Sequence, residues 1–554
     1  LDARIWEKKK KNPSRSDPST MALQAAYEYL QQAVGHGAWS STQTLTLLLI
    51  AVPTVLLLLA SLAKSTSSSG RGKPPLPPSP PGTLPIVGHL HHIGPQTHIS
   101  LQELVAKYGH NGFLFLRAGA VPTLIVSSPS AAEAVMRTHD HIFASRPWSM
   151  ASHILRYNTC DVAFSPLGEY WQQTRKLMNT HLLSNKKVYS FRHGREEEVC
   201  LVVDNLREAA AKSPSTAVDM SEVLAAYTND VVSRSVLGST HRKKGRNTLF
   251  REMTMTNVDL LVGFNLEYYI PRWPLTDLLF RLVCWKVTRH LKRWDALLEE
   301  VIHEHVEMRK LSGDKEKESD DFIDIFLSRY EEYGFTMDNV KSLLMNVFEA
   351  AIETSYLVLE SAMAELMNHR RVMKKLQAEV RAYGAEKKLD MIREDDLSSL
   401  PYLKASMKEA LRLHPPGPLL LPHYSTADCQ IDGYHIPANT RVLVNGWAIG
   451  RDPAVWEKPE EFMPERFMRD GWDKSNSYSG QDFRYLPFGS GRRICPGANF
   501  ALATMEIMLA NLMYHFDWEV PNEKEDGGGK VSMDETFGLM LRRNEPLYLV
   551  PRAV

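Results

Sequence analysis

One cysteine in this chain lies in a setting suited to binding a metal cofactor. Residues 488–497 read Phe-Gly-Ser-Gly-Arg-Arg-Ile-Cys-Pro-Gly, which places Cys495 in a loop rich in glycine and proline. Glycine lets the backbone take positive φ and approach a flat ligand closely. Backbone N–H groups directed at the sulfur would lower its pKa and tune a bound metal. The apolar run that follows predicts a helix whose positive N-terminal end also favours a thiolate.

The neighbours of Cys495 narrow the choice of ligand. Phe488 offers an apolar lid, Arg493 offers a cation, and Gly491 and Gly497 tighten the loop. Haem held by a proximal thiolate needs all of these, because its iron takes the sulfur and its propionates take the cation. A lone cysteine is most often a small buried hydrophobic residue. The five positions together would arise by chance only on the order of 10⁻⁴ times in such a chain, at roughly 5% usage of each residue type.

This loop resembles the haem-binding loop of the cytochrome P-450 family, Phe-x-x-Gly-x-Arg-x-Cys-x-Gly, at every fixed position. The resemblance implies a mainly α fold with small β-sheets and a haem b cofactor (iron protoporphyrin IX). It implies Cys495 as the axial thiolate ligand, and Phe488, Gly491, Arg493 and Gly497 as cofactor-binding residues. The chain looks most like a plant microsomal A-type member, since a Pro-Pro-Ser-Pro-Pro-Gly segment accompanies the loop.

A second motif lies on a helix predicted over residues 337–368. It reads Ala-Ala-Ile-Glu-Thr-Ser from Ala350 and resembles the family's oxygen-binding helix, Ala-Gly-x-Asp/Glu-Thr-Thr/Ser. Oxygen activation at haem needs two protons, which an alcohol and an acid linked by water can deliver. We therefore predict Glu353 and Thr354 as catalytic residues. The alternative is a buried helix whose threonine bonds back to the carbonyl of residue i−4. Ala351 replaces the usual glycine and could narrow the oxygen groove.

Two further sites resemble the family's contacts to the haem propionates. Trp171 and Arg175 are one helical turn apart and match Trp-x-x-x-Arg, and a guanidinium suits bidentate pairing with a carboxylate. The alternative is an aromatic anchor beside an exposed cation. His423 lies where family members carry Arg or His toward a propionate, although a lone histidine is more often a satisfied polar residue.

A third resemblance concerns assembly of the pocket and not catalysis. Glu409 and Arg412 match the family's Glu-x-x-Arg helix, and Arg466 lies in the Pro-Glu-Arg-Phe segment that usually supplies the third member. Most Glu/Arg pairs at this spacing are surface salt bridges worth under roughly 1 kcal/mol. The resemblance implies a buried structural triad instead.

Composition excludes several other classes of protein. The chain has 554 residues, a formal net charge of zero and 44% hydrophobic residues. Balanced charge argues against a nucleic-acid partner. Five widely spaced cysteines without a Cys-x-x-Cys pair support neither a disulfide framework nor a zinc site. Length alone suggests several domains, but no paired βαβ domains emerge, so we predict one large helical domain.

The N-terminal region predicts a membrane anchor. Residues 1–43 read as a disordered extension, and residues 44–63 carry no charge and are long enough to span a bilayer. Lys64, Arg71 and Lys73 follow at once, which places the remainder in the cytosol. Residues 64–82 are basic and Pro-rich, as in a stiff hinge, and residues 83–554 form the catalytic domain. A cleaved signal peptide and an SH3-type ligand are the respective alternatives.

Apolar periodicity predicts helices through most of the catalytic domain. The predicted helices cover residues 100–108, 130–138, 168–183, 196–211, 220–237, 285–311, 337–368, 372–383, 402–413 and 498–514, and the predicted strands cover 113–117, 123–127 and 441–444. Residues 313–320 and 527–529 read as loops.

These features predict a haem-thiolate monooxygenase that inserts one oxygen atom from O₂ into an apolar substrate. By family analogy, a membrane-bound NADPH–cytochrome reductase supplies electrons, NADPH acts only through that partner, and membrane lipid contacts residues 44–63. The resemblance implies a single-pass protein of the endoplasmic reticulum. An isomerase or dehydratase, or a non-catalytic haem sensor, is the alternative, against which Glu353 and Thr354 argue.

The substrate follows only from the residues that relatives use to line the pocket. Leu419–Leu421, Phe537, Leu539 and Met540 are mostly aliphatic and predict a bulky substrate with few polar groups. Likeness to grass members of defence metabolism favours a diterpene, with a flavonoid or an amino-acid-derived oxime as the alternative.

Overall fold

The structure is a computed structural model that describes residues 74–554 apart from gaps at 85–86, 214, 263–268, 271–275, 277–279, 282–283, 313–320, 470–477, 479 and 522–528. The predicted extension (1–43), the predicted anchor (44–63) and most of the hinge lie outside the described residues, as does the predicted loop at 313–320. The catalytic domain is described through most of its length.

Helices make up most of the described chain. They are α4 (Thr97–Tyr108), α5 (Pro129–Glu133), α6 (Asp140–Phe143), α7 (Met150–Leu155), α8 (Glu169–Leu177), α9 (Asn185–Ser190), α10 (Arg192–Lys212), α11 (Met220–Leu237), α12 (Arg246–Val262), α14 (Trp285–Ser312), α15 (Phe322–Arg329), α16 (Met337–Asn368), α17 (Arg370–Lys387), α18 (Pro401–Leu413), α19 (Gly446–Ile449) and α20 (Ala498–His515). Every predicted helix is present. Those predicted over 130–138 and 168–183 continue from α5 and α8 into the π-helical turns η3 (Ala134–Thr138) and η4 (Met178–Leu182).

The strands are short and form small sheets. They are β1 (Phe113–Ala118), β2 (Val121–Val126), β3 (Val218–Asp219), β4 (His423–Tyr424), β5 (Cys429–Ile431), β6 (Tyr434–Ile436), β7 (Arg441–Val444), β8 (Phe516–Glu519), β9 (Glu535–Thr536), β10 (Arg542–Arg543) and β11 (Tyr548–Ala553). One sheet has the order β1-β2-β7-β4, with β2 parallel to β7, and another has the order β3-β11-β8. The remaining strands pair as β5 with β6 and β9 with β10.

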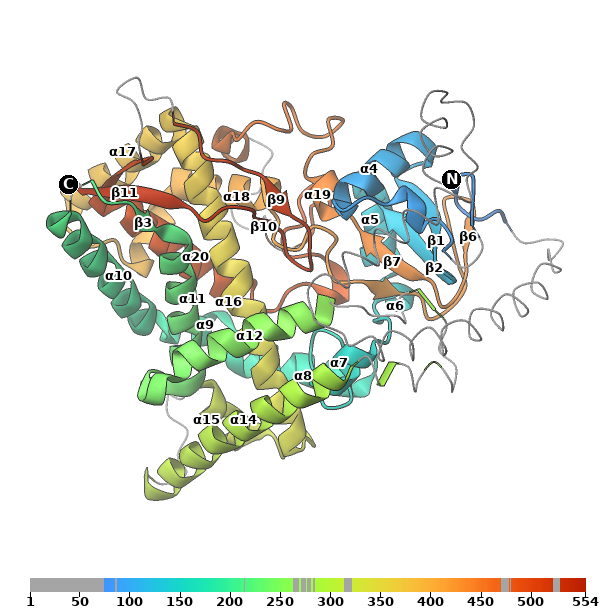
Figure 1. Ribbon diagram of the computed structural model, residues 1–554, viewed down its shortest axis with the longest axis horizontal. Coiled ribbons are helices and arrows are strands. Elements are labelled where there is room, and N and C mark those ends of the chain that lie inside the picture. Colours follow the sequence, from blue (N-terminus) through green and yellow to red (C-terminus); the bar gives the residue numbers. More distant parts are fainter. Residues whose placement is uncertain are drawn as a thin grey trace, which may run out of the picture.

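The elements divide the molecule into a helical part and a smaller sheet part (Figure 1). The four-stranded sheet lies at one end with α4 and α5 against it, while α10, α11, α16, α17 and α20 fill the other end. The β9–β10 hairpin lies near α16, between the two parts. The predicted class, mainly α with small β-sheets, is confirmed.

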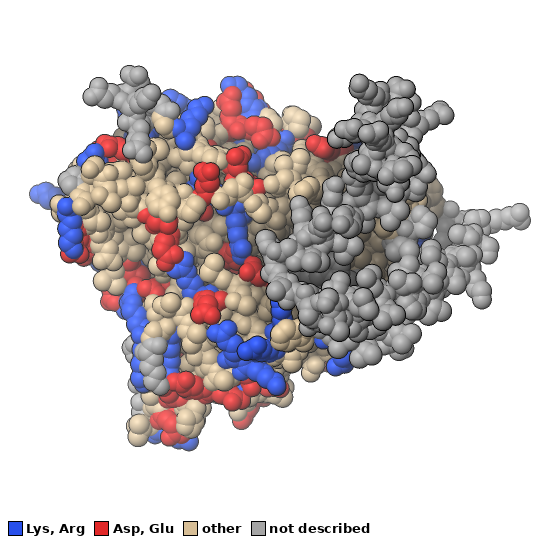
Figure 2. Space-filling model, viewed as in Figure 1, with Lys and Arg blue, Asp and Glu red and all other residues tan. Residues whose placement is uncertain are grey.

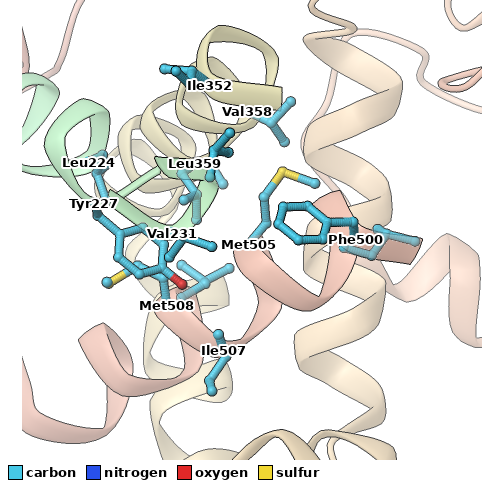
Figure 3. Close-up of a cluster of buried hydrophobic side chains, with 14 of the residues drawn as sticks. Leu224, Tyr227, Val231, Ile352, Val358, Leu359, Phe500, Met505, Ile507 and Met508 are labelled. Carbon is cyan, nitrogen blue, oxygen red and sulfur yellow. The ribbon is translucent and has the colours of Figure 1, made fainter. Parts of the chain in front are cut away.

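Helix α16 is the centre of the helical part. Its first turn is fixed by a capping box, in which Thr336 accepts from the Asn339 N–H and Asn339 accepts from the Thr336 N–H. It packs against α11 and α20, and Figure 3 shows the apolar cluster where the three helices meet. The labelled members of that cluster are Leu224, Tyr227, Val231, Ile352, Val358, Leu359, Phe500, Met505, Ile507 and Met508.

Within the described residues, α16 is also the one helix long and apolar enough to cross a bilayer. However, 78% of its apolar window is buried inside the molecule, as expected for a central core helix. On the face of the molecule shown in Figure 2, acidic and basic side chains are intermingled wherever the surface is not grey. This mixture agrees with the zero net charge of the whole sequence.

Candidate active site

The cysteine loop depends on glycines in the left-handed region of φ. Gly489 has φ +70° and Gly491 has φ +66°. A Cβ on Gly491 would lie 1.9 Å from the carbonyl oxygen of Met136, so no side chain fits there. The Cys495 N–H donates to the Phe488 carbonyl at 2.9 Å, which closes the loop directly before α20 begins. Gly491 thus lets the loop pack directly against the backbone of Met136, while a Cβ on Gly489 would meet no atom nearer than 3.8 Å, which leaves space beside the loop.

Cys495 is an exposed residue. Packed protein atoms nevertheless surround its thiol and desolvate it. Desolvation raises the pKa of the Cys495 thiol. The backbone N–H groups of Gly497 and Ala498 and the charge of Arg175 act in the opposite direction. These groups would stabilise the thiolate once a metal replaces the thiol proton.

The predicted oxygen-binding helix turns a thinly covered face toward open space. Ala350 is exposed, and Val347, Ala351 and Thr354 are half-buried, although nearly all other residues of this stretch of α16 are buried. The small side chains of Ala350 and Ala351 therefore leave a notch on this face of α16. The Thr354 hydroxyl donates to the Ala350 carbonyl at 2.6 Å, which is the back-bonded arrangement considered as the alternative. The two interpretations are compatible, because the hydroxyl oxygen can still accept a hydrogen bond.

Glu353 does not join Thr354 in this arrangement. Its side chain is buried, and its Oε1 accepts from Nε of Arg542, on β10, at 2.5 Å. The other carboxylate oxygen has no hydrogen-bond partner within the described part of the chain. Glu353 and Thr354 are thus neighbours in sequence on α16, but their side chains bind different partners.

The predicted propionate contacts gather beside the cysteine loop. Arg493 donates to the carbonyl oxygens of Ala144 at 2.6 Å, Val162 at 3.3 Å and Ser165 at 2.6 Å. Its guanidinium lies 4.1 Å above the ring of Trp171. The Trp171 indole N–H donates to the Val162 carbonyl at 3.1 Å, so these two predicted residues share one wall.

Arg175 and His423 complete the predicted set. Arg175 donates to the carbonyl oxygen of Ile494, directly before Cys495. His423 is buried in β4, and its Nδ1 bonds with the Phe143 carbonyl at 2.9 Å. Burial and then the nearby charge of Arg146 lower the pKa of His423 to about 3, so its ring is neutral at physiological pH.

Sequence reasoning missed Arg146. Its side chain is buried and donates to the carbonyl oxygens of Ala163, Leu421 and Pro422 at 2.8–2.9 Å. No pattern along the chain distinguishes this arginine, because its contacts join segments far apart in sequence.

The arginines of this region suit an anionic ligand. Desolvation, together with the like charges of Arg146 and Arg175, lowers the pKa of the Arg493 guanidinium to about 8. Asp161 acts in the opposite direction, yet three cations still lie within mutual electrostatic reach in a desolvated setting. Two propionates would offset that repulsion through charge-assisted hydrogen bonds. The residues present, including the glycine-rich loop and the sulfur, therefore fit haem.

The predicted structural triad is confirmed. Glu409 and Arg412 are fully buried and form two bonds of 2.8 Å, and Arg466 Nε donates to the same carboxylate at 2.9 Å. The Met463 N–H adds a further bond at 2.8 Å. Arg412 also donates to the Gly450 carbonyl at 2.6 Å. The triad fastens α18 to the 3₁₀ turn η9 (Pro464–Met468) and lies apart from the catalytic groups.

Comparison with known proteins agrees with this geometry. The Cytochrome P450 family profile matches residues 77–549. The chain is 99% identical over 533 residues to "Cytochrome P450 71C3" of Zea mays, covering 96% of this chain and 100% of that protein. It is 59% identical to the "Indolin-2-one monooxygenase" of Zea mays, covering 96% and 99% of the two chains, and 54% identical to the "3-hydroxyindolin-2-one monooxygenase" of Zea mays, covering 96% and 98%.

A solved structure shares the fold. A zebra fish cytochrome P450 with abiraterone superposes with a TM-score of 0.67 at 24% identity, covering 83% of this chain and all of that one. The family profile, the relatives over their whole length, and the glycine-bracketed cysteine beside α20 all lead to one assignment. The chain belongs to the cytochrome P450 family and is a haem-thiolate monooxygenase.

Proposed function

We propose that this monooxygenase hydroxylates a bicyclic aromatic lactam. The observation that carries the proposal is the likeness, at 59% and 54% identity over nearly the whole chain, to two maize enzymes named for indolin-2-one and 3-hydroxyindolin-2-one. Both names describe a flat benzo-fused ring with a cyclic amide. This substrate class replaces the diterpene expected from the sequence.

The structure indicates why the aliphatic residues predicted to line the pocket are a weak guide to the substrate class. Phe537 stacks on the ring of His98, 5.4 Å between centroids, and packs in a small cluster with Leu419 against α4. Some of the apolar residues predicted to line the pocket therefore pack against the sheet part of the molecule instead. The side chains left to meet a substrate need not enclose a bulky hydrocarbon.

The chain's own residues would share the work as follows. Bound haem would supply the site of O₂ binding and activation, with Cys495 as its axial ligand. Arg175 and Arg493 would hold its propionates, with Trp171 fixing the plane of Arg493. The small residues Ala350 and Ala351 would leave room beside it.

Proton supply would fall to α16. The Thr354 hydroxyl, held by the Ala350 carbonyl, keeps its lone pairs free to accept from water on the open face. Glu353 is the nearest acid along the helix and would replenish those protons. Its pairing with Arg542 holds its carboxylate toward β10.

We further propose that the chain is a single-pass protein of the endoplasmic reticulum membrane. Residues 44–63 would be the span, residues 64–82 the hinge and residues 83–554 the cytosolic catalytic domain, as the positive residues after the span favour. Electrons would come from an NADPH–cytochrome reductase. The half-exposed Arg492, 3.0 Å from Asp140, lies on the cysteine-loop side where such a partner would dock.

The test is a substrate panel with microsomes that contain this chain and a plant reductase. Indolin-2-one, 3-hydroxyindolin-2-one and a six-membered benzo-fused lactam are compared with a pimaradiene-type olefin, a flavanone and an aromatic oxime. We expect NADPH-dependent hydroxylation of at least one lactam. Turnover of the olefin, the flavanone or the oxime without turnover of any lactam would refute the proposal.

A further inference from the structure

The C-terminal β9–β10 hairpin is joined to the catalytic helix by a charged contact. Arg542, on β10, places Nε 2.5 Å from Oε1 of Glu353 on α16. The same guanidinium places Nη1 3.5 Å from Oδ1 of Asp259, near the end of α12. The loop between β9 and β10 is the stretch expected to line the substrate pocket, so one side chain joins that loop, the catalytic helix and α12.

The two partners of this ion pair differ in burial. The Glu353 side chain is 3% exposed, whereas that of Arg542 is 37% exposed. A buried carboxylate is costly unless it is paired. The second oxygen of Glu353 has no hydrogen-bond partner among the described residues. Arg542 is therefore the group that compensates the buried carboxylate of Glu353.

A second contact fastens the same hairpin to the same helix farther from the catalytic groups. Arg543 lies 3.6 Å from Glu360, and Glu360 also accepts from the Ser221 hydroxyl. Glu360 lies about two helical turns beyond Glu353. The hairpin thus has two arginine attachments to α16, and only the one at Glu353 adjoins Thr354.

We propose that Arg542 is a positioning residue for Glu353. It holds the carboxylate directed at the C-terminal hairpin, so that a shift of the 536–541 loop changes how readily Glu353 passes protons toward Thr354. Substrate contact with the loop and proton supply at α16 are thereby coupled through a single ion pair. This inference rests on the proposed roles of Glu353 and Thr354, but not on the identity of the substrate.

The structure supplies a matched control. Arg542→Gln removes the attachment beside Thr354, and Arg543→Gln removes the attachment beside Glu360, on the same strand and with the same change of charge. Both are made in the full haem-loaded chain, with the reduced–CO spectrum confirming intact thiolate-ligated haem. Each variant is assayed with reductase for product formed per NADPH consumed and for hydrogen peroxide released.

We expect Arg542→Gln to lower the product formed per NADPH about fivefold or more, with a matching rise in hydrogen peroxide. The reason is that proton supply to the active site becomes poorly controlled while electron supply from the reductase is unchanged. Arg542→Lys should restore much of the ratio. Arg543→Gln should leave the ratio within about twofold of wild type. The assay uses whichever compound of the panel shifts the haem spectrum on binding, so failure of the lactam proposal would not be mistaken for failure of this one.

A second readout does not depend on turnover. Melting temperatures of Arg542→Gln, Glu353→Gln and the double variant form a cycle. We expect the double variant to melt close to the single variants, because each single change already breaks the pair. Equal losses of coupling in Arg542→Gln and Arg543→Gln, or additive losses in the cycle, would overturn the proposal.

Discussion

Two arginine-rich regions of the molecule differ in how their charge is balanced. In the first, Arg412 and Arg466 share the buried carboxylate of Glu409. In the second, Arg175 and Arg493 donate to backbone carbonyls. The first region therefore holds two guanidinium groups on one buried carboxylate, whereas the second pairs its guanidinium groups with uncharged backbone oxygens.

The difference agrees with the proposal that the first set of residues holds the fold and the second set holds the cofactor. A buried guanidinium with a matched carboxylate has all of its electrostatic needs met by the chain. Several guanidinium groups that face one another through backbone oxygens repel, as the lowered pKa of Arg493 indicates. This difference in charge balance supports the proposal that Arg175 and Arg493 hold the haem propionates.

The largest expected effect comes from the sulfur at the centre of the second region. Cys495→Ala removes the one side chain able to ligate the iron from this loop, so turnover and the thiolate-type reduced–CO band should both be lost. Cys429→Ala, at a buried cysteine in β5, is the control. Pigment and turnover that survive in Cys495→Ala would remove the basis of the site described above.

Glu409→Gln is expected to damage the first region severely. It leaves the buried Arg412 and Arg466 without their carboxylate, and breaking a buried pair costs about 3–5 kcal/mol. Yield of folded protein and the free energy of unfolding should fall accordingly. Glu519→Gln is the matched control, because its pair with Arg552 is 48% and 41% exposed and is worth at most about 1 kcal/mol. Equal losses of stability in Glu409→Gln and Glu519→Gln would contradict the structural role of the buried triad.

Arg493→Gln should weaken haem binding and leave the fold intact. A charge-assisted hydrogen bond contributes about 1.5–3 kcal/mol, or roughly a tenfold to a hundredfold change in affinity. Haem transfer to an acceptor protein measures that loss. The haem-free variant should lose less stability than Glu409→Gln, because removal of a repulsive charge offsets part of the loss of three carbonyl hydrogen bonds. A haem-free variant that unfolds as readily as Glu409→Gln would erase the distinction between the two regions.

The smallest effect concerns a cluster whose charge balance depends on pH. His414 lies 2.7 Å from Glu365 and 2.8 Å from Glu535 on β9. Burial opposes protonation, but the two carboxylates outweigh it and raise the pKa of His414. The pKa of Glu365 is lowered to about 2: desolvation acts against this shift, and hydrogen bonds from His369 and His414 outweigh it.

The sign of the resulting pH dependence follows from these directions. The contribution of His414 to stability is complete below its unfolded-state pKa near 6.5 and is lost as pH rises through the raised folded-state value. The contribution of Glu365 is lost only as pH falls toward 2. We expect His414→Gln to cost about 1–2 kcal/mol at pH 6, and melting curves across pH should show the gap closing toward alkaline pH. A difference in melting temperature between wild type and His414→Gln that grows as pH rises would contradict the raised pKa of His414.

The local motifs of the site could be read from the sequence because each lies within one turn or one helix. The cysteine loop, the Thr354 notch and the pair of Glu409 with Arg412 have spacings that the backbone fixes directly. Helices α11 and α16 match their predicted bounds, since both are long and rich in apolar residues that are buried. Only contacts inside an element were needed for these predictions.

Contacts between distant segments could not be predicted in this way. Arg542 reaches Glu353 across 189 positions, and Arg146 contacts the carbonyl of Leu421 across 275. Strands such as β3 and β9 are only two residues long, so their pairing depends on tertiary packing and not on alternation. Helix α12 was missed because its apolar residues do not gather on one face.

The last strand has a consequence for how the enzyme is made. In β11, Leu549 pairs with Val218 of β3, and Val550 pairs with Glu519 of β8. Most of the polypeptide must therefore leave the ribosome before the sheet that joins its early and late parts can close. Until then β3 and β8 lack the strand that joins them, and the nascent chain remains incompletely folded. Slowing translation before Leu549 should increase dependence on chaperones.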